Sequence, residues 1–138
     1  MNEITLLAIL LFLEAGGEPY AGKIMVAEVV QNRRVKSGKS WKETMLAPKQ
    51  FSCFNNRKKL NKMLEDIDKG KYRNDQIFND CLLIAKTYVK GNIMTTTPAT
   101  HYYAHDRLKA PPCWAASMDE VARVAGHVFM AEKARVAK

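Results

Sequence analysis

The chain has 138 residues, 47% of them hydrophobic, so it can bury one core of its own. This length excludes two independent domains without disulfides or metals, and three widely spaced cysteines argue against a disulfide framework. The formal net charge is +8, from 22 Lys and Arg against 14 Asp and Glu, which favours anionic partners such as nucleic acid, lipid headgroups or wall polymers. We therefore expect a single domain over residues 1–138.

The first predicted element is a helix over residues 3–14 that is apolar on nearly every side, which predicts a central place in the core. No Lys or Arg precedes its run ITLLAILLFL and no small-residue cleavage site follows, so we interpret it as a buried helix and not as a signal peptide. It is far shorter than the ~20 apolar residues that span a bilayer, so we expect no stable membrane insertion. We expect Gly16 and Gly17 to end this helix in the left-handed conformation.

Further helices are predicted in the middle of the chain. One covers residues 20–36 and closes at Gly38, the usual place for a helix-ending glycine. The capping-box pattern Ser40–Glu43 opens a short helix after it. Apolar residues at helical spacing predict two more helices, over 57–70 and 74–91.

The last third of the chain has a different pattern. Residues 95–105 are β-branched and aromatic, which favours extended structure. Residues 121–130 fit either a helix or two short strands broken at Gly126, because periodicity does not separate the two for so short a segment. We therefore predict an α+β fold that is mainly α-helical, with a small sheet near the C-terminal end.

Two carboxylates, Glu14 and Glu18, stand where the first apolar helix meets a turn. A carboxyl group at the end of an apolar helix, at the rim of a cleft, is partly desolvated, which disfavours its ionised form. An acid that keeps its proton can protonate a leaving group, as cleavage of a glycosidic bond requires. Glu14 suits this catalytic role because hydrocarbon side chains precede it and glycines follow it. Glu18 is a candidate second carboxylate, and it also suits the positive end of the next helix.

A second group of candidate residues is aromatic or histidine. They are His101, Tyr102, Tyr103, His105 and Trp114. Aromatic rings stack on the apolar faces of sugars or on bases, and their polar tips form hydrogen bonds at a wet site. Ordinary packing would explain the same residues equally well.

Other chemistry has weaker support. His101 and His105 resemble half a metal site that Cys113 or His127 could complete, but there is no HExxH and no closely paired zinc spacing. A Cys–His nucleophile has nothing in its favour beyond the residue types. The basic stretches QNRRVK and RKKLNK come with no recognition motif for nucleic acid, so we interpret them as solvated helix faces. We expect no metal, no cofactor and no nucleic-acid partner.

Four segments in chain order carry a resemblance to a known family. They are EAGGEPYAGKIMVAEVVQNR, KQFSCF, THYYA with PCW, and VARVAGHVFM. Together they resemble the cell-wall hydrolase family of the spore cortex-lytic enzymes, the SleB and CwlJ type. The matching motifs lie at Glu14–Pro19, Asn32–Arg33, Gln50–Ser52 and Gly126–Phe129. Gly16 stands where the family often has arginine, and Met130 departs from the family's final aromatic.

The resemblance implies a lysozyme-like domain that cleaves the β-1,4 bond between N-acetylmuramic acid and N-acetylglucosamine in peptidoglycan. It implies a lytic transglycosylase that gives a 1,6-anhydro product, with Glu14 as its acid. The residues that we predict to contact the substrate are Gln50, Ser52, Tyr102, Tyr103 and Trp114. The predicted supporting residues are Asn32, His101 and His127.

Three alternatives stay open at this point. One is a hydrolytic muramidase with Glu18 as its second carboxylate, one is a metal-dependent amidase built on the histidines, and one is a non-enzymatic basic module that binds wall polymer or nucleic acid. A bare catalytic domain without an export signal resembles a phage or prophage endolysin. Such a protein is made in the host cytoplasm and reaches the wall after holin-type release. We expect it to act on glycan strands as a monomer.

Overall fold

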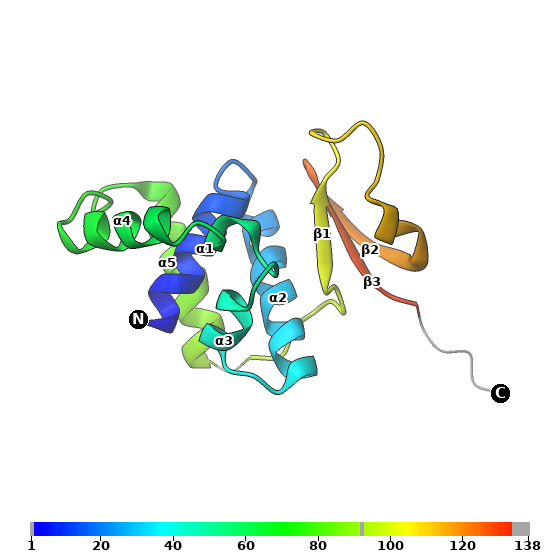
Figure 1. The fold of residues 1–138 in the computed structure, drawn as a ribbon, viewed down its shortest axis with the longest axis horizontal. Helices are drawn as coiled ribbons and strands as arrows, with labels where there is room; N and C mark the ends of the chain where they lie inside the picture. Colours follow the sequence, from blue (N-terminus) through cyan, green and yellow to red (C-terminus); the bar gives the residue numbers. More distant parts are fainter. Residues whose placement is uncertain (1, 92, 134–138) are drawn as a thin grey trace.

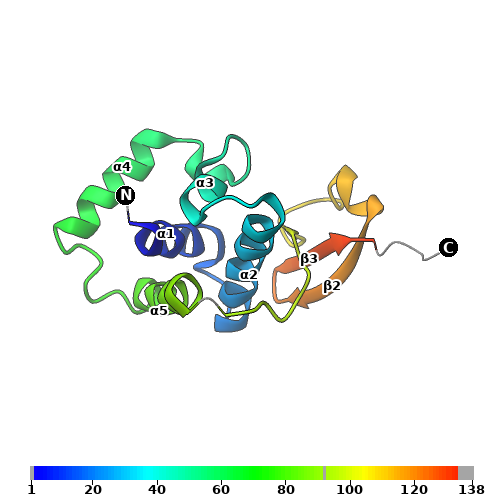
Figure 2. The same ribbon diagram turned by 90° about the horizontal axis from the view of Figure 1, so that it is seen from below.

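Helix α1 (Glu3–Ala15) lies at the centre of the helical part of the molecule (Figures 1 and 2). The computed structural model describes residues 2–91 and 93–133. All six side chains from Leu6 to Leu11 are fully buried, because α1 is apolar on every side and has neighbours all around it. The elements around it are α2 (Tyr20–Ser37), α3 (Trp41–Leu46), the 3₁₀ turn η1 (Ser52–Phe54), α4 (Arg57–Asp68) and α5 (Gln76–Gly91). The predicted central helix is confirmed.

Two of the helix ends form as their local sequence predicts. The Ser40 hydroxyl accepts a hydrogen bond from the Glu43 amide, and the Glu43 carboxylate accepts one from the Ser40 amide, which completes the capping box of α3. Gly38 ends α2 with a left-handed backbone (φ +70°), and its amide donates to the Arg34 carbonyl.

The end of α1 differs from the prediction. Gly16 has φ −59°, and among the described residues the glycines with positive φ are Gly38 and Gly70, so the left-handed ending predicted at Gly16 and Gly17 is wrong. A Cβ at residue 16 would lie 2.4 Å from the carbonyl oxygen of Phe12. Glycine is therefore required at residue 16 for a close approach of backbone to backbone, and not for a positive φ.

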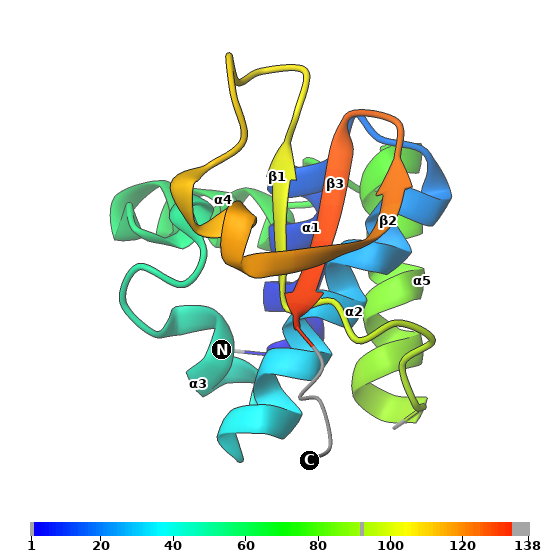
Figure 3. The same cartoon turned by 90° about the vertical axis from the view of Figure 1, so that its right-hand side faces the viewer.

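The last third of the chain forms a three-stranded antiparallel sheet beside α2 (Figures 1 and 3). Its strands are β1 (His101–Ala104), β2 (Met118–Val124) and β3 (His127–Glu132), in the order β1-β3-β2. A tight turn at Ala125 and Gly126 joins β2 to β3, so the ambiguous segment 121–130 forms two strands and not a helix. Tyr102 of β1 pairs with Phe129 of β3.

The central strand β3 is covered on both faces of the sheet. On the inner face, Phe129 is buried in the same core cluster as α1, and Tyr102 packs against that cluster. On the outer face, Val128 and Met130 pack under the short turn η2 (Cys113–Ser117). This explains why β3 is buried along nearly its whole length. Only four residues of the extended stretch 95–105 belong to a strand.

One core thus joins the helices to the sheet, and it places the end of α1 next to β1. Within residues 2–91 and 93–133, no helix combines the length and the apolar character needed to cross a bilayer.

Candidate active site

The last turn of α1 opens into a hollow of about 250 Å³, which we call the Glu14 hollow. Glu14 is half-buried there. The other lining residues come from α2, from the loop before η1, from η1 and from β1. They are Arg33, Lys49, Gln50, Phe51, Ser52 and Tyr102. The hollow therefore brings together the predicted acid and three of the five predicted substrate contacts, namely Gln50, Ser52 and Tyr102.

Arg33 connects the walls of the Glu14 hollow. Its Nε donates to the Thr100 carbonyl at 2.5 Å and its Nη1 donates to the Gln50 carbonyl at 3.0 Å. Its guanidinium lies 4.7 Å from the centre of the Phe51 ring. Burial lowers the pKa of Arg33, while the nearby Tyr102 and Glu14 oppose that shift. Arg33 thus fixes the loop at Gln50 relative to the start of β1.

Two protonated groups lie near the Glu14 carboxylate. Burial, reinforced by the charge of Glu14, raises the pKa of the Tyr102 hydroxyl well above 10. Burial and the same charge also raise the pKa of the Cys53 thiol above its usual value of 9.0. Both groups therefore stay protonated near neutral pH, where a hydroxyl and a thiol are hydrogen-bond donors suited to a carboxylate.

Glu18 is engaged elsewhere. Its Oε1 lies 2.5 Å from Nδ1 of His127, and its Oε2 accepts a hydrogen bond of 3.3 Å from the Gly126 amide. The buried ammonium of Lys23 donates to the Glu18 carbonyl. A Cβ at residue 126 would lie 2.8 Å from carboxylate oxygens of both Asp106 and Glu18, so a larger residue there would displace these side chains. Glu18 joins the α1–α2 turn to the β2–β3 turn and does not line the Glu14 hollow.

The aromatic and histidine residues are divided between the two faces of the sheet. Tyr102 faces inward, with its ring centre 5.5 Å from that of His127. Tyr103 and His101 face outward, with ring centres 6.0 Å and 5.1 Å from that of Trp114. This follows from the alternation of side chains along a strand. The structure therefore does not bring Tyr103 and Trp114 to the Glu14 hollow.

The remaining predicted residues have clear positions. The Asn32 side-chain amide donates to the carbonyls of Thr97 and Ala99, at 2.7 and 2.8 Å, and so positions the segment before β1. His105 Nε2 lies 2.8 Å from the carbonyl of Ala125, at the far end of β1. In the described parts of the chain, no three His, Cys, Asp or Glu side chains form a group that could hold a metal ion.

Sequence reasoning missed Arg33, Lys49 and Cys53 as lining or neighbouring residues of this site. Arg33 belongs to the Asn-Arg pair of the second helix, and Lys49 directly precedes Gln50. The signal available in the sequence for a role in the site was that each of them is adjacent to a predicted site residue. Nothing in the sequence alone shows that these residues lie near Glu14.

Comparisons with known proteins agree with this fold. The sequence profile of the Cell Wall Hydrolase family matches residues 17–130, a range that begins just after Glu14. Among solved structures, the catalytic domain of the germination-specific lytic transglycosylase SleB from Bacillus anthracis matches with a TM-score of 0.61, at 20% sequence identity and over 94% of each chain. Comparison with curated proteins gives no significant match. The predicted lysozyme-like, mainly helical α+β fold is confirmed. Because the profile covers most of the sequence, this chain belongs to the cell wall hydrolase family.

Proposed function

We propose that this cell wall hydrolase cleaves the β-1,4 bond between N-acetylmuramic acid and N-acetylglucosamine as a lytic transglycosylase, with Glu14 as its acid and base. The SleB domain that shares the fold is itself described as a lytic transglycosylase. One observation carries the proposal for this chain. Among the described residues that line the Glu14 hollow, Glu14 is the single carboxylate.

The mechanism needs only that one group. Protonated Glu14 donates to the glycosidic oxygen, the bond from that oxygen to C1 of muramic acid breaks, and an oxocarbenium-like state develops at C1. The resulting carboxylate then takes the proton from the 6-hydroxyl of the same sugar. The 6-oxygen bonds to C1 and closes the 1,6-anhydro ring, so no water is consumed and Glu14 regains its proton.

Glu18 is the candidate for the second carboxylate that a hydrolytic muramidase requires, but it does not line the Glu14 hollow. Such enzymes place two carboxyl groups on either side of the scissile bond. Glu18 instead binds His127 and the Gly126 amide, away from the hollow. Its contacts favour a structural role, and they favour the transglycosylase over the two-carboxylate hydrolase.

The residues around Glu14 suit a polar sugar. Tyr102 and Cys53 stay protonated near Glu14, so both can donate to its carboxylate in the half of the cycle in which it is ionised. Gln50 and Ser52 are exposed at the hollow and can hydrogen-bond acetamido and hydroxyl groups of the glycan. Tyr103 and Trp114 would contact the polymer only beyond the hollow, on the outer face of the sheet.

Replacing the acid tests the assignment. Glu14→Gln keeps the size and the hydrogen-bonding capacity of the side chain but cannot cycle a proton, so we expect at least ~100-fold slower clearing of purified peptidoglycan with an unchanged unfolding midpoint. The matched control is Glu65→Gln, on the exposed side of α4, which should clear peptidoglycan at the wild-type rate. Near-normal activity of Glu14→Gln would remove Glu14 from the mechanism.

The product distinguishes the two chemistries. Mass spectrometry of the soluble muropeptides should show fragments lighter by one water than hydrolytic products. Reducing-end muramic acid as the main product would instead establish a hydrolase and reject the transglycosylase step.

We also propose that the protein works as an endolysin in phage or prophage lysis. The net charge of +8 supports attraction to the anionic wall, and the apolar run that opens the chain forms the centre of the folded core. Production in a bacterial host should lyse the cells only when a holin is also produced. Equal lysis with and without the holin would contradict this route.

A further inference from the structure

We propose that Lys49 binds a carboxylate of the substrate next to the scissile bond. As a result, this enzyme prefers peptidoglycan whose muramic acid bears a free lactyl carboxylate or a carboxylate-bearing peptide. The inference rests on the proposed function and adds to it a preference for negatively charged substrate. The carboxylate has two sources, the lactyl group or the stem peptide, and they share the same chemistry.

The Glu14 hollow is one of three that adjoin around the loop between α3 and η1. A second hollow, also of about 250 Å³, shares Lys49 with it, and a third, of about 190 Å³, shares Arg33 and Gln50. The second and third hollows share Ala47. The three hollows are therefore neighbours around this loop, and we refer to them together as the depression.

The depression is strongly basic. Among the described residues, its charged lining side chains are those of Glu14, Arg33, Lys39, Lys49 and Arg57, which are four cations against one carboxylate. If Glu14 is protonated when the substrate binds, as the proposed mechanism requires, the lining has no negative charge in that state. A neutral glycan would gain no electrostatic attraction from such a lining, whereas carboxylates on the polymer would be attracted to it.

Lys49 differs from the other three cations. Arg33 and Arg57 already donate to backbone carbonyls, of Thr100, Gln50 and Leu46. Lys39 lines the third hollow, and Glu14 is not among the lining residues of that hollow. Lys49 is exposed, lines the Glu14 hollow itself, and forms no ion pair within the described residues. Its ammonium is therefore available to an anionic ligand beside Glu14.

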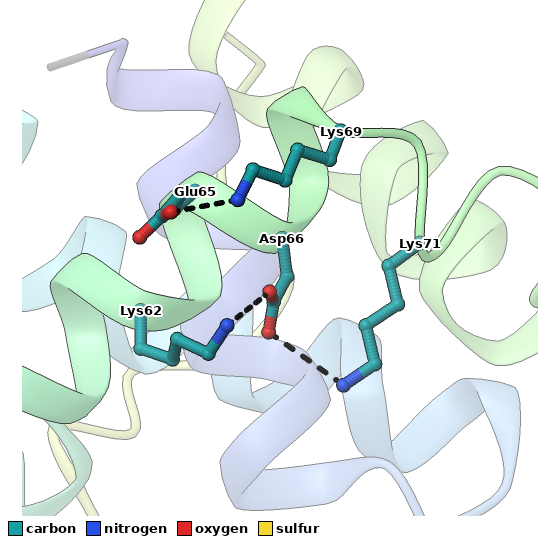
Figure 4. A network of polar contacts seen from close by, with 5 residues as sticks. All are labelled: Lys62, Glu65, Asp66, Lys69 and Lys71. Atoms are coloured by element: carbon teal, nitrogen blue, oxygen red, sulfur yellow. Dashed lines mark hydrogen bonds and ion pairs between the residues drawn. The ribbon is translucent and has the colours of Figure 1, made fainter.

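The lysines of α4 and of the turn that follows it show the contrast. Lys62 and Lys71 both bind Asp66, at 2.9 and 3.6 Å, and Lys69 binds Glu65 at 2.8 Å (Figure 4). Those lysines lie on a surface with its own acids, whereas Glu14 is the only acid among the described residues that line the two hollows of Lys49.

The backbone at Lys49 supports a specific position for its side chain. Lys49 has φ +62°, a left-handed conformation that costs free energy for any residue with a Cβ. Such outliers persist where the surroundings hold them, and they gather at functional sites. The conformation fixes the direction in which the side chain leaves the loop beside Gln50.

The chemistry of the substrate brings a carboxylate to this place. The lactyl ether is on C3 of the same muramic acid whose C1 forms the scissile bond, so its carboxyl group or peptide begins within one sugar ring of Glu14. A cation on the rim of the Glu14 hollow is therefore positioned to meet a lactyl carboxylate or the first charged group of a peptide.

Initial rates on chemically modified walls test this. The substrates are purified sacculi, the same sacculi with their carboxyl groups converted to neutral amides by carbodiimide and ammonia, and glycan strands stripped of peptides by an amidase. For the wild type we expect kcat/KM to fall about tenfold on amidated sacculi, mainly through KM, because a charge-assisted hydrogen bond is lost. On native sacculi, the kcat/KM of Lys49→Gln should be lower than that of the wild type by the same factor. Amidation of the sacculi should then change the kcat/KM of this variant little.

Two variants complete the design. Lys49→Arg keeps the charge and should keep the preference for native over amidated sacculi. Lys86→Gln removes one exposed charge from α5, away from the three hollows, and should behave like the wild type, which separates a specific contact from net charge. The amidase frees the lactyl carboxyl group, which is an amide wherever a peptide is attached. On stripped strands, a persistent gap between wild type and Lys49→Gln therefore shows that Lys49 can bind the lactyl carboxylate, and convergence of the two identifies the stem peptide.

The result that overturns the inference is equal wild-type activity on native and amidated sacculi, or the same response to amidation in Lys49→Gln as in the wild type. Failure of the proposed function looks different. In that case the wild type would release no muropeptides from any of the three substrates, and Glu14→Gln would match it.

Discussion

At the scale of single residues, buried polar side chains hold the segment between α5 and β1 in place. Glu28 of α2 is almost fully buried, and its carboxylate accepts hydrogen bonds from the Tyr88 hydroxyl at 2.7 Å and from the Thr96 amide at 2.9 Å. One side chain thus joins α2, α5 and the irregular segment that leads into β1. Removing one of its donors leaves a buried acceptor with fewer partners, which is costly.

Tyr88→Phe tests this network through the size of the stability loss and through the dependence of stability on pH. We expect a loss of about 2 kcal/mol in the free energy of unfolding near pH 7, because a buried hydrogen bond to a charged group disappears. Tyr20→Phe, at an exposed tyrosine, is the matched control and should change stability by under ~0.5 kcal/mol.

The pH dependence has a defined sign. Burial, with Glu28 beside the hydroxyl, raises the pKa of Tyr88 above its ordinary value of 10.0. Above about pH 10 the unfolded chain loses this phenol proton while the folded protein retains it, so stability that is complete below pH 10 is lost as the pH rises. Denaturant titrations between pH 8 and about pH 11 should show a shallower alkaline loss for Tyr88→Phe. Parallel curves for variant and wild type would refute this origin.

At the scale of the elements, the α1–α2 turn and the β2–β3 turn are held together by Glu18. The carboxylate binds His127 and Gly126 across the gap between helices and sheet, and Gly126 leaves room for it. This contact fixes the sheet relative to the end of α1, where Glu14 lies. Glu18 therefore affects the site through the placement of β1 and not through chemistry.

Glu18→Gln should accordingly destabilise the fold by about 1–2 kcal/mol and leave the turnover of the folded enzyme within about threefold of wild type. The control is Glu120→Gln, which removes an exposed ion pair to Arg123 and should have little effect on either quantity. A loss of turnover as large as that of Glu14→Gln, without loss of stability, would instead give Glu18 a catalytic role.

At the scale of the whole molecule, the helices and the sheet share one core, in which Phe129 of β3 packs with residues of the helical body. We propose from this that the chain folds as a single cooperative domain. The two tryptophans report on different parts, since Trp41 is buried in α3 and Trp114 lies on the outer face of the sheet. Single-tryptophan variants, Trp41→Phe and Trp114→Phe, allow each part to be followed separately.

The fluorescence of each variant and its own far-UV circular dichroism should give one coincident denaturant transition. Separate transitions for helices and sheet would show two units that unfold independently. Because each tryptophan replacement also shifts stability, the comparison is made between the two signals of one variant and not between variants.

The sequence by itself determined the features that depend on neighbouring residues. The capping box at Ser40, the ending of α2 at Gly38 and the central, all-apolar first helix follow from local pattern, since each involves contacts within a turn or a continuous run. The family motifs also singled out Glu14, Gln50 and Ser52, which line one hollow. The left-handed ending at Gly16 failed because the constraint there is a backbone approach that residue type does not reveal.

Only the tertiary structure decided which residues meet across long distances. Neighbours on a strand face opposite sides, so Tyr102 reaches Glu14 while Tyr103 packs on Trp114, and the choice depends on the register of β1 against β3. The partner of Glu18 was equally hidden, because His127 follows more than a hundred residues later. Pairings of this kind are fixed by the packing of the whole core, and local sequence carries no direct record of them.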